Sequence, residues 1–307
     1  MNLFIVGNGF DLAHGRHTEY SDFHEYLKIT YPEALHIEPS FNFSSTTLPD
    51  GSELYEQSEV VAFIMDVISR AEADGENWCD IENSLGMLDY ANYYDDMSNL
   101  FDEDDKKYNP FHMAYNYEDV SNDFYKVTSK IKDLFSEWIN TIQISDVIAK
   151  KSFEEIIDIS NDYCISFNYT RILEKIYRMK NVFHLHGLQN SEIIIGHGIL
   201  RTEFENIYTG TEDILWEIHH SLKKDTDKII ENWGSLFNSL NSVDKIYSHG
   251  FSFSDVDLPY IEKICEVIDT ENITWFLNDY EDDTVRDKYM SRIRRCGYEG
   301  AFSVFSI

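Results

Sequence analysis

Two polar side chains, Asn168 and His186, follow apolar runs of the sequence and are the residues best suited to do chemistry. An asparagine amide both donates and accepts hydrogen bonds, as the hydroxyls of a ribose require. A histidine has an ordinary pKa of about 6.5, which suits a general base near neutral pH. We therefore predict that Asn168 and His186 form a catalytic centre that holds a ribose and activates water. His184, which strand alternation would place on the same face as His186, is the rival base.

A glycine-containing turn follows the first apolar run. Glycine lets the backbone approach a ligand closely, and the free N–H groups at the start of a helix attract an anion. The turn is therefore predicted to seat a pyrophosphate, whereas its carboxylate is expected to face a ribose or cap the helix. A tight turn without a ligand is the alternative for such a short loop. The residues are Gly7, Asn8, Gly9, Phe10 and Asp11, with Gly15 further along.

The other candidate ligand-binding residues also follow apolar runs. In open α/β sheets, ligands bind outside the carboxyl ends of the strands. Strand ends that converge on one edge therefore predict a single site. Each residue also has a structural alternative: Asn168 and Asp255 could cap helices, and His186 could be a core histidine. The further candidates are Gly187, His197, Gly250, Ser252 and Asp255.

The elements that must position these residues alternate between strands and helices. Apolar runs predict strands at 3–7, 163–167, 182–187, 193–196, 245–251, 273–277 and 302–307. Most are nearly continuous apolar runs, which is typical of strands buried on both faces of a parallel sheet. Helical patterns lie at 171–179, 255–269 and 282–295. This alternation predicts a doubly wound, mainly parallel, Rossmann-like α/β sheet with its first strand near the centre.

A long segment separates the first two predicted strands. Its length of about 150 residues is far beyond a simple crossover, and its apolar spacing is helical. We predict a helical insertion at about 18–160, covering the strand ends, within a single α/β domain that spans 1–307. An acidic stretch at 93–107 is expected to be a surface loop, and a second helical stretch is expected at 211–240.

The composition is strongly acidic. There are 25 Lys and Arg residues against 56 Asp and Glu residues, a formal net charge of −31. Such a charge repels a phosphate backbone, so extended nucleic-acid binding is not expected. The basic run "RIRR" at 292–295 is interpreted as a solvated helix face.

The spacing of the cysteines and the hydropathy exclude further classes of protein. Four cysteines lie far apart and form no C-x-x-C pair, which excludes a zinc ribbon and argues against a disulfide framework. The start of the chain lacks the features of a signal peptide, and no apolar run reaches the length of about 20 residues that spans a membrane. The expectation is a cytoplasmic protein without membrane contact, resident metal or required cofactor.

Several motifs resemble the abortive-infection AbiH family of bacterial antiphage proteins. They occur in order along nearly the whole chain: "FIVGNGFDLAHG" from Phe4, "YSDF" from Tyr20, Trp78-x-x-x-Glu82-x-x-Leu85, "SFNYT" from Ser166, "HLHG" from His184, "IGHG" from Ile195 and "HGFSFSDVDLPY" from His249. The chain departs from the family pattern at residues 16–18, where "RHT" stands in place of a Leu-Pro-Thr-like segment. The resemblance implies a role in bacteriophage defence.

A more distant resemblance is to sirtuin-type NAD-binding domains. Their glycine loop is similar to 7–11, their asparagine matches Asn168, their His-Gly matches His186-Gly187, and their late Gly-x-Ser matches 250–252. Asp11 stands where those domains have serine, Thr170 stands where they have an acid, and the zinc ribbon is missing. Protein deacylation is therefore not expected. The resemblance implies a pocket for NAD or a related nucleotide, as substrate or ligand.

Three functions remain open at this point. The first is hydrolysis of NAD or a related nucleotide, as an NAD(P) glycohydrolase-type enzyme. The second is nucleotide sensing or partner binding without turnover, with a homo-oligomer or another defence protein as partner. The third is a metal-dependent nuclease built on Asp11, Glu82 and Asp255, which the negative charge argues against.

Overall fold

The computed structural model describes the chain except residues 73–77, 100–109, 202–203 and 205–207. The described residues form two compact units. The first consists of 1–19, 139–194 and 224–307, and the second of 20–138 and 195–223.

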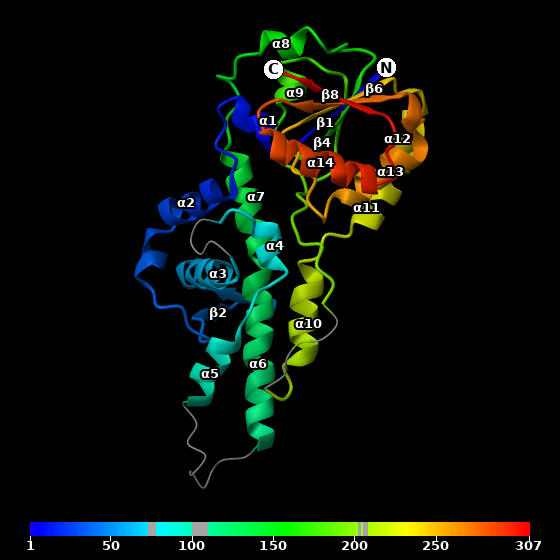
Figure 1. Ribbon diagram of the computed structural model, residues 1–307. Coiled ribbons are helices and arrows are strands. Elements are labelled where there is room, and N and C mark those ends of the chain that lie inside the picture. The colour runs from blue at the N-terminus through cyan, green and yellow to red at the C-terminus, as the bar shows by residue number, and fades with distance from the viewer. Residues whose placement is uncertain (73–77, 100–109, 202–203, 205–207) are drawn as a thin grey trace. The chain divides into compact units, whose positions relative to one another are not determined.

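A parallel sheet forms the centre of the first unit (Figure 1). Its strands, in the order β5-β4-β1-β6-β7-β8, are all parallel to their neighbours. This order confirms the predicted doubly wound, Rossmann-like sheet with the first strand near its centre. The strands are β1 (Asn2–Val6), β4 (Tyr163–Ser166), β5 (Asn181–His184), β6 (Lys245–His249), β7 (Thr274–Asn278) and β8 (Ala301–Phe305).

Helices cover both faces of this sheet (Figure 1). On one side lie α1 (Asn8–Ala13), α8 (Lys151–Glu154) and α9 (Ile172–Lys175). On the other side lie α11 (Thr226–Asn232), α12 (Gly234–Asn238), α13 (Leu258–Val267) and α14 (Asp283–Arg295). Asp282 starts α14 by accepting a hydrogen bond from the N–H of Val285 at 2.9 Å, as an N-cap does.

One predicted strand, at 193–196, is wrong. Ile193 forms only an isolated bridge with Gly187, and the N–H of Ile194 donates to the carbonyl of His186 at 2.9 Å. The apolar run is therefore used to close a tight turn after β5. A short apolar run cannot be distinguished by periodicity alone from such a turn.

The second unit is mostly helical. Its helices are α2 (Tyr20–Thr30), α3 (Gln57–Ala71), α4 (Ile81–Leu85), α5 (Ala91–Asn99), α6 (Pro110–Ser129), most of α7 (Ile131–Thr141) and α10 (Glu212–Ser221). Helix α10 packs against α6 (Figure 1). The sequence did not indicate the small hairpin of β2 (Ser45–Thr47) and β3 (Glu53–Tyr55). The stretch expected to be a loop at 93–107 is helical up to Asn99, with Tyr93 and Tyr94 buried, and its remainder lies outside the described residues.

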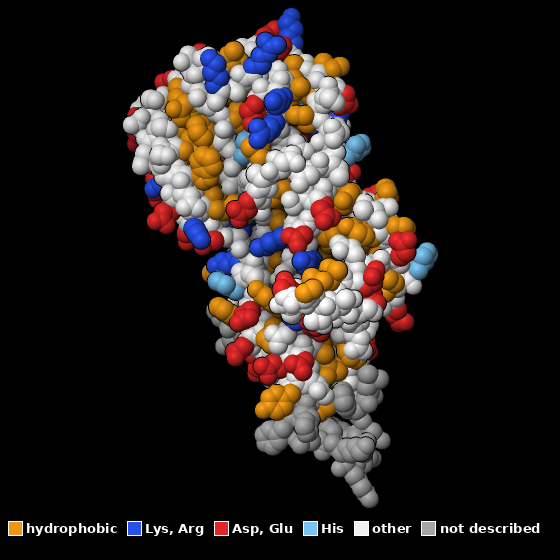
Figure 2. Space-filling model, turned by 180° about the vertical axis from the view of Figure 1, so that it is seen from behind, with side chains coloured by type: hydrophobic (Ala, Val, Ile, Leu, Met, Phe, Trp, Pro, Cys, Tyr) orange, Lys and Arg blue, Asp and Glu red, His pale blue; other side chains and the backbone are white. Residues whose placement is uncertain are grey.

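The surface carries the acidic excess of the sequence. Figure 2 shows one face of the molecule, on which acidic side chains are scattered among apolar and basic ones. Among the residues that the structure describes, no helix combines the length and the apolar character needed to cross a membrane.

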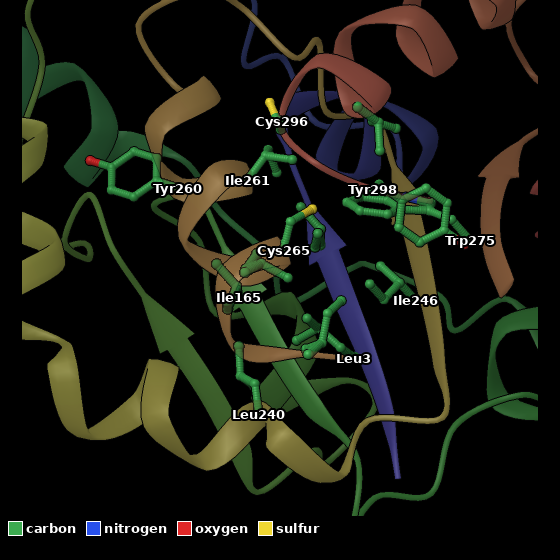
Figure 3. Close-up of a cluster of buried hydrophobic side chains, with 14 of the residues drawn as sticks. Leu3, Ile165, Leu240, Ile246, Tyr260, Ile261, Cys265, Trp275, Cys296 and Tyr298 are labelled. Carbon is green, nitrogen blue, oxygen red and sulfur yellow. The ribbon is translucent and has the colours of Figure 1, made fainter. Parts of the chain in front are cut away.

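The core of the first unit follows from strand alternation. Successive residues of a strand point to opposite faces, so Leu3 and Ile5 of β1 pack toward α13, whereas Phe4 and Val6 pack toward α8 and α9. Figure 3 shows side chains of β1, β4 and β6 meeting Ile261 and Cys265 of α13 in the first of these layers. Both apolar core layers end at the carboxyl edge of the sheet, where the side chains that follow the strands are polar.

Candidate functional site

The candidate residues of the first unit lie at one edge of the sheet. Because β1, β4, β5 and β6 are parallel neighbours, the residues that follow them emerge on the same side. Val6 is in register with Ser166 and His249, and Ser166 with His184. The structure therefore brings the turn after Gly7, Asn168 and His186 to the same carboxyl edge, as the sequence predicted.

The glycines after β1 allow two backbones to touch. A Cβ on Gly7 would lie 2.5 Å from the carbonyl oxygen of Gly250, and a Cβ on Gly9 would lie 2.6 Å from the Cα of Gly250. The N–H of Gly7 donates to the carbonyl of His249, and the N–H of Gly9 to the carbonyl of Gly250, each at 3.0 Å. Two amides that the sequence analysis assigned to a phosphate are thus engaged within the protein.

A buried carboxylate, Asp11, lies at the start of α1. Its two oxygens accept hydrogen bonds from the side chains of Asn168 at 2.8 Å and Thr170 at 2.7 Å. Burial raises the pKa of Asp11 to about 6, and the hydrogen bonds from Thr170 and Asn168 limit the rise. Asp11 is therefore mostly ionised at pH 7 and has a pKa close to neutrality.

His184 joins the same group of side chains. Its Nδ1 donates to the carbonyl of Asn168 at 2.8 Å, and its Nε2 lies 3.1 Å from Oε1 of Glu174 on α9. Both ring nitrogens are thus engaged. We call Asp11, Asn168, Thr170, His184 and Glu174 the Asp11 cluster.

His186 belongs to a second group, with Asp257 and Lys224. Its Nε2 lies 3.7 Å from Oδ1 of Asp257, and the Lys224 ammonium donates to the same oxygen at 3.3 Å. Ser254 donates to the other oxygen of Asp257 at 3.1 Å. Burial opposes ionisation of Asp257, but Lys224, His186 and Ser254 together outweigh it and hold the pKa of Asp257 below its usual value.

The electrostatic environment of His186 differs from the ordinary one assumed from the sequence. Burial, and after it the positive charge of Lys224, lowers the pKa of His186 to about 3. The imidazole is therefore neutral at pH 7 and is a weak base. Its Nε2 is buried and has no hydrogen-bond partner among the described residues.

The expectation that His184 and His186 share a face is wrong. Strand β5 ends at His184, so alternation stops there, and Gly187 adopts a φ of +89° in the turn that follows. His184 reaches α9, whereas the ring of His186 lies 5.0 Å from that of Phe167 in the opposite core layer.

A cavity of about 490 Å³ opens beside the glycine turn. Its walls come from α1, from the end of β6 and the residues after it, and from the end of β7 and the following loop. His249 lines it and is 5 % exposed. Burial, with His14 and Lys150 nearby, lowers the pKa of His249 to about 4. Other lining residues include Gly9, Lys150, Gly250, Phe251, Ser252, Asn278, Asp279 and Tyr289.

The remaining predicted residues are not gathered into one site. His197 is buried in the second unit, where the carbonyl of His219 and the N–H of Ile199 engage its ring nitrogens. Asp255 is 82 % exposed in its side chain and lies 3.7 Å from Arg292. Phe10 is in the core, and the exposed Asn8 donates to the carbonyl of Thr18 at 2.8 Å.

Asp257, Lys224, Glu174 and the orientation of His249 were not predicted from the sequence. A signal existed for Asp257, because Pro259 marks the first turn of a helix and places Asp257 at its N-cap. No local pattern pointed to Lys224, whose position depends on a contact with residues far along the chain.

The order of the strands and the cavity at their ends define the structural class of this protein. This is a Rossmann-like α/β protein with a hollow at the carboxyl edge of its sheet. Residues 3–279 match the family described as bacteriophage abortive infection AbiH, and the chain belongs to that family, which acts in bacterial defence against phage. No curated protein and no solved structure matches the chain. The resemblance to sirtuin-type domains stays a prediction.

Proposed function

We propose that the cavity binds NAD or a related nucleotide and that hydrolysis of this nucleotide is the chemistry of phage defence. One observation carries the proposal: the cavity lies at the switch point of the sheet. The chain winds from β1 to β4 and β5 in one direction and from β6 to β7 and β8 in the other. Gly9, after β1, and Gly250, after β6, both line the cavity. Doubly wound sheets bind nucleotides at this point.

The lining suits the nucleoside half of such a ligand. A volume of about 490 Å³ is in the range of small-molecule sites. Phe251 and Tyr289 offer aromatic surface, and Asn278 can both donate and accept hydrogen bonds. The carboxylates of Glu19, Asp279 and Glu281 can accept hydrogen bonds from ribose hydroxyls.

Hydrolysis of the nicotinamide–ribose bond needs a group that takes a proton from water. Water attacks the anomeric carbon, nicotinamide leaves with the bonding electron pair, and the proton passes to a base. The sequence analysis named His186 with Asn168 for this step. Gly9, Leu12 and Ala13 of α1 line the cavity, but the side chains of Asp11 and His186 do not. Because the pKa of His186 is lowered to about 3 and that of Asp11 is raised to about 6, we now propose Asp11 as the proton acceptor, which requires the nicotinamide end of the nucleotide to reach the Asp11 cluster. Asn168 holds Asp11 by its hydrogen bond.

The test measures binding and turnover separately. Calorimetry with NAD, ADP-ribose and adenosine reports affinity, and mass spectrometry reports nicotinamide and ADP-ribose formed from NAD. Asp11→Asn should lower turnover by about 10²–10⁴-fold and retain affinity. His186→Gln is the matched variant and should retain most of the turnover. If His186→Gln loses turnover while Asp11→Asn keeps it, the base is His186; if folded protein binds none of these ligands, the proposal fails.

Nucleotide sensing without turnover is the second candidate. It is favoured by the Asp11 cluster, in which Asn168 and Thr170 already occupy both carboxylate oxygens. Affinity for NAD without loss of NAD on incubation would support this candidate.

The nuclease hypothesis has less support. Within the described residues, no group of three His, Cys, Asp or Glu side chains is placed to hold a metal ion. Asp11 is buried, whereas Asp255 is exposed beside Arg292. Metal-dependent cleavage of DNA or RNA by the purified protein would favour it nevertheless.

A further inference from the structure

The glycine turn leaves the phosphates of a bound nucleotide without an evident partner. The amides of Gly7 and Gly9 donate to the carbonyls of His249 and Gly250. Lys150 is the cation among the described residues that line the cavity, where three carboxylates also lie. A phosphate therefore needs cations from elsewhere.

A basic hollow on α14 can supply them. It has a volume of about 380 Å³ and is lined by Lys288, Tyr289, Ser291, Arg292 and Arg295. Residues 288, 291, 292 and 295 are spaced by three or four, so they lie on one face of the helix. This is the surface that the sequence analysis interpreted as a solvated helix face.

The hollow adjoins the nucleoside cavity. Tyr289 lines both. Arg292 donates a hydrogen bond to the carbonyl of Phe253, which is itself part of the cavity wall. A ligand whose nucleoside fills the cavity can therefore extend past Tyr289 onto α14.

The charge of the hollow is unusual for this chain. The protein carries a net charge of −31, yet Lys288, Arg292 and Arg295 gather here, and Asp255, 3.7 Å from Arg292, is an opposing carboxylate. Arginine and lysine bind phosphate through charge-assisted hydrogen bonds, and a local positive patch concentrates an anionic ligand.

We propose that Lys288, Arg292 and Arg295 on α14 form the phosphate subsite of the nucleotide cavity, in place of the glycine turn. The inference rests on the proposed nucleotide binding and names its ligand class: a nucleotide carrying a diphosphate, held by its nucleoside in the cavity and by its phosphates on α14.

The experiment compares adenosine with ADP by calorimetry. The wild-type protein should bind ADP more tightly than adenosine, with an affinity for ADP that falls as NaCl is raised. The double variant Lys288→Gln/Arg295→Gln should bind ADP about 10-fold or more weakly and adenosine within about twofold of wild type. Lys263→Gln is the matched control, because Lys263 is a partly exposed lysine on α13 that pairs with Glu266. It should change neither affinity.

The outcomes separate the two proposals. Wild-type protein that binds ADP no more tightly than adenosine overturns the subsite, as does a double variant that loses both ligands equally or keeps both. If folded wild-type protein binds neither adenosine nor ADP, the nucleotide function itself fails. Circular dichroism of each variant checks that it is folded.

Discussion

Burial dominates the behaviour of the Asp11 carboxylate. Asn168 and Thr170 each donate one hydrogen bond to it, and the charges of His184 and Arg16 also favour its ionised form, but burial outweighs these effects. Its pKa of about 6 means that folding favours the protonated form. The unfolded chain releases this proton at lower pH than the folded protein does.

Asp11→Asn should therefore change how stability depends on pH. Between about pH 4 and 6 the folded wild-type protein binds a proton that the unfolded chain has lost, so its free energy of unfolding falls as pH rises. The asparagine can accept from Asn168, donate to Thr170 and stay neutral. The variant should gain stability relative to wild type across this range, by up to about 3 kcal/mol at pH 7.

Urea unfolding at pH 4, 5, 6 and 7 measures this difference. Glu299→Gln removes an exposed carboxylate of the same unit and serves as the control for loss of one charge. A difference between Asp11→Asn and wild type that stays constant with pH would mean that Asp11 is not a buried acid of this kind.

The sequence correctly predicted the edge of the sheet at which the candidate residues lie, but not the chemistry of the individual residues there. Asn168 and His186 were placed correctly because residues after parallel strands must emerge together. The pKa of His186 could not be foreseen, since it depends on burial and on Lys224, whose contact with Asp257 joins residues distant in the sequence. The exposed Asp255 was chosen over Asp257 because the sequence signal at Pro259, which marks the start of the helix, was not used.

At the scale of elements, the apolar runs predicted every strand of the large sheet. A continuous apolar run such as that of β1 indicates a strand buried on both faces. In the structure β1 is buried along both faces. The run at 193–196 failed because its residues close a turn. The glycines after β1 were recognised, but the sequence did not reveal that they allow close contact with the backbone of Gly250.

Gly250→Ala should test this contact between the turn after β1 and the turn after β6. The new Cβ would lie 2.4 Å from Gly9, and Gly250 has a φ of +62°. Steric overlap with Gly9 and backbone strain at residue 250 therefore both oppose the change. We expect a loss of about 2 kcal/mol or more in the free energy of unfolding. The affinity for nucleotide should fall as well, because Gly250 lines the cavity.

Gly234→Ala provides the matched control in α12. A Cβ at Gly234 meets nothing within 4 Å and the residue is helical. This variant should be unchanged or slightly more stable in urea, by up to about 1 kcal/mol. Equal losses in both variants would show that the close approach at Gly250 has no special energetic role.

At the scale of the whole molecule, the dominant property is charge. An excess of 31 negative charges repels itself in the folded state, and the acidic side chains are scattered over the face in Figure 2 rather than paired in one patch. Salt bridges on the surface are individually weak, so they relieve little of this repulsion.

Raising NaCl from about 0.05 to 0.5 M should therefore raise the thermal midpoint by a few degrees, because the Debye length shortens from more than 10 Å to less than 5 Å. Differential scanning calorimetry measures the shift for both compact units. KCl should act like NaCl, since screening depends on ionic strength. A midpoint that falls or stays constant with salt would show that self-repulsion does not limit stability.

The position of β1 has a consequence for synthesis on the ribosome. This strand is paired on one edge with β4 and on the other with β6, so that Leu3 faces Tyr163 and Ile246. It is translated long before either partner, and until β4 and β6 follow, the backbone N–H and C=O groups on both of its edges stay unpaired. Such non-local pairing is slow and exposes the nascent chain to aggregation. The residues of the cavity wall are equally dispersed along the sequence, from Gly9 to Ile307. We therefore expect a nascent chain to be unable to bind nucleotide until the last of these wall residues has been translated.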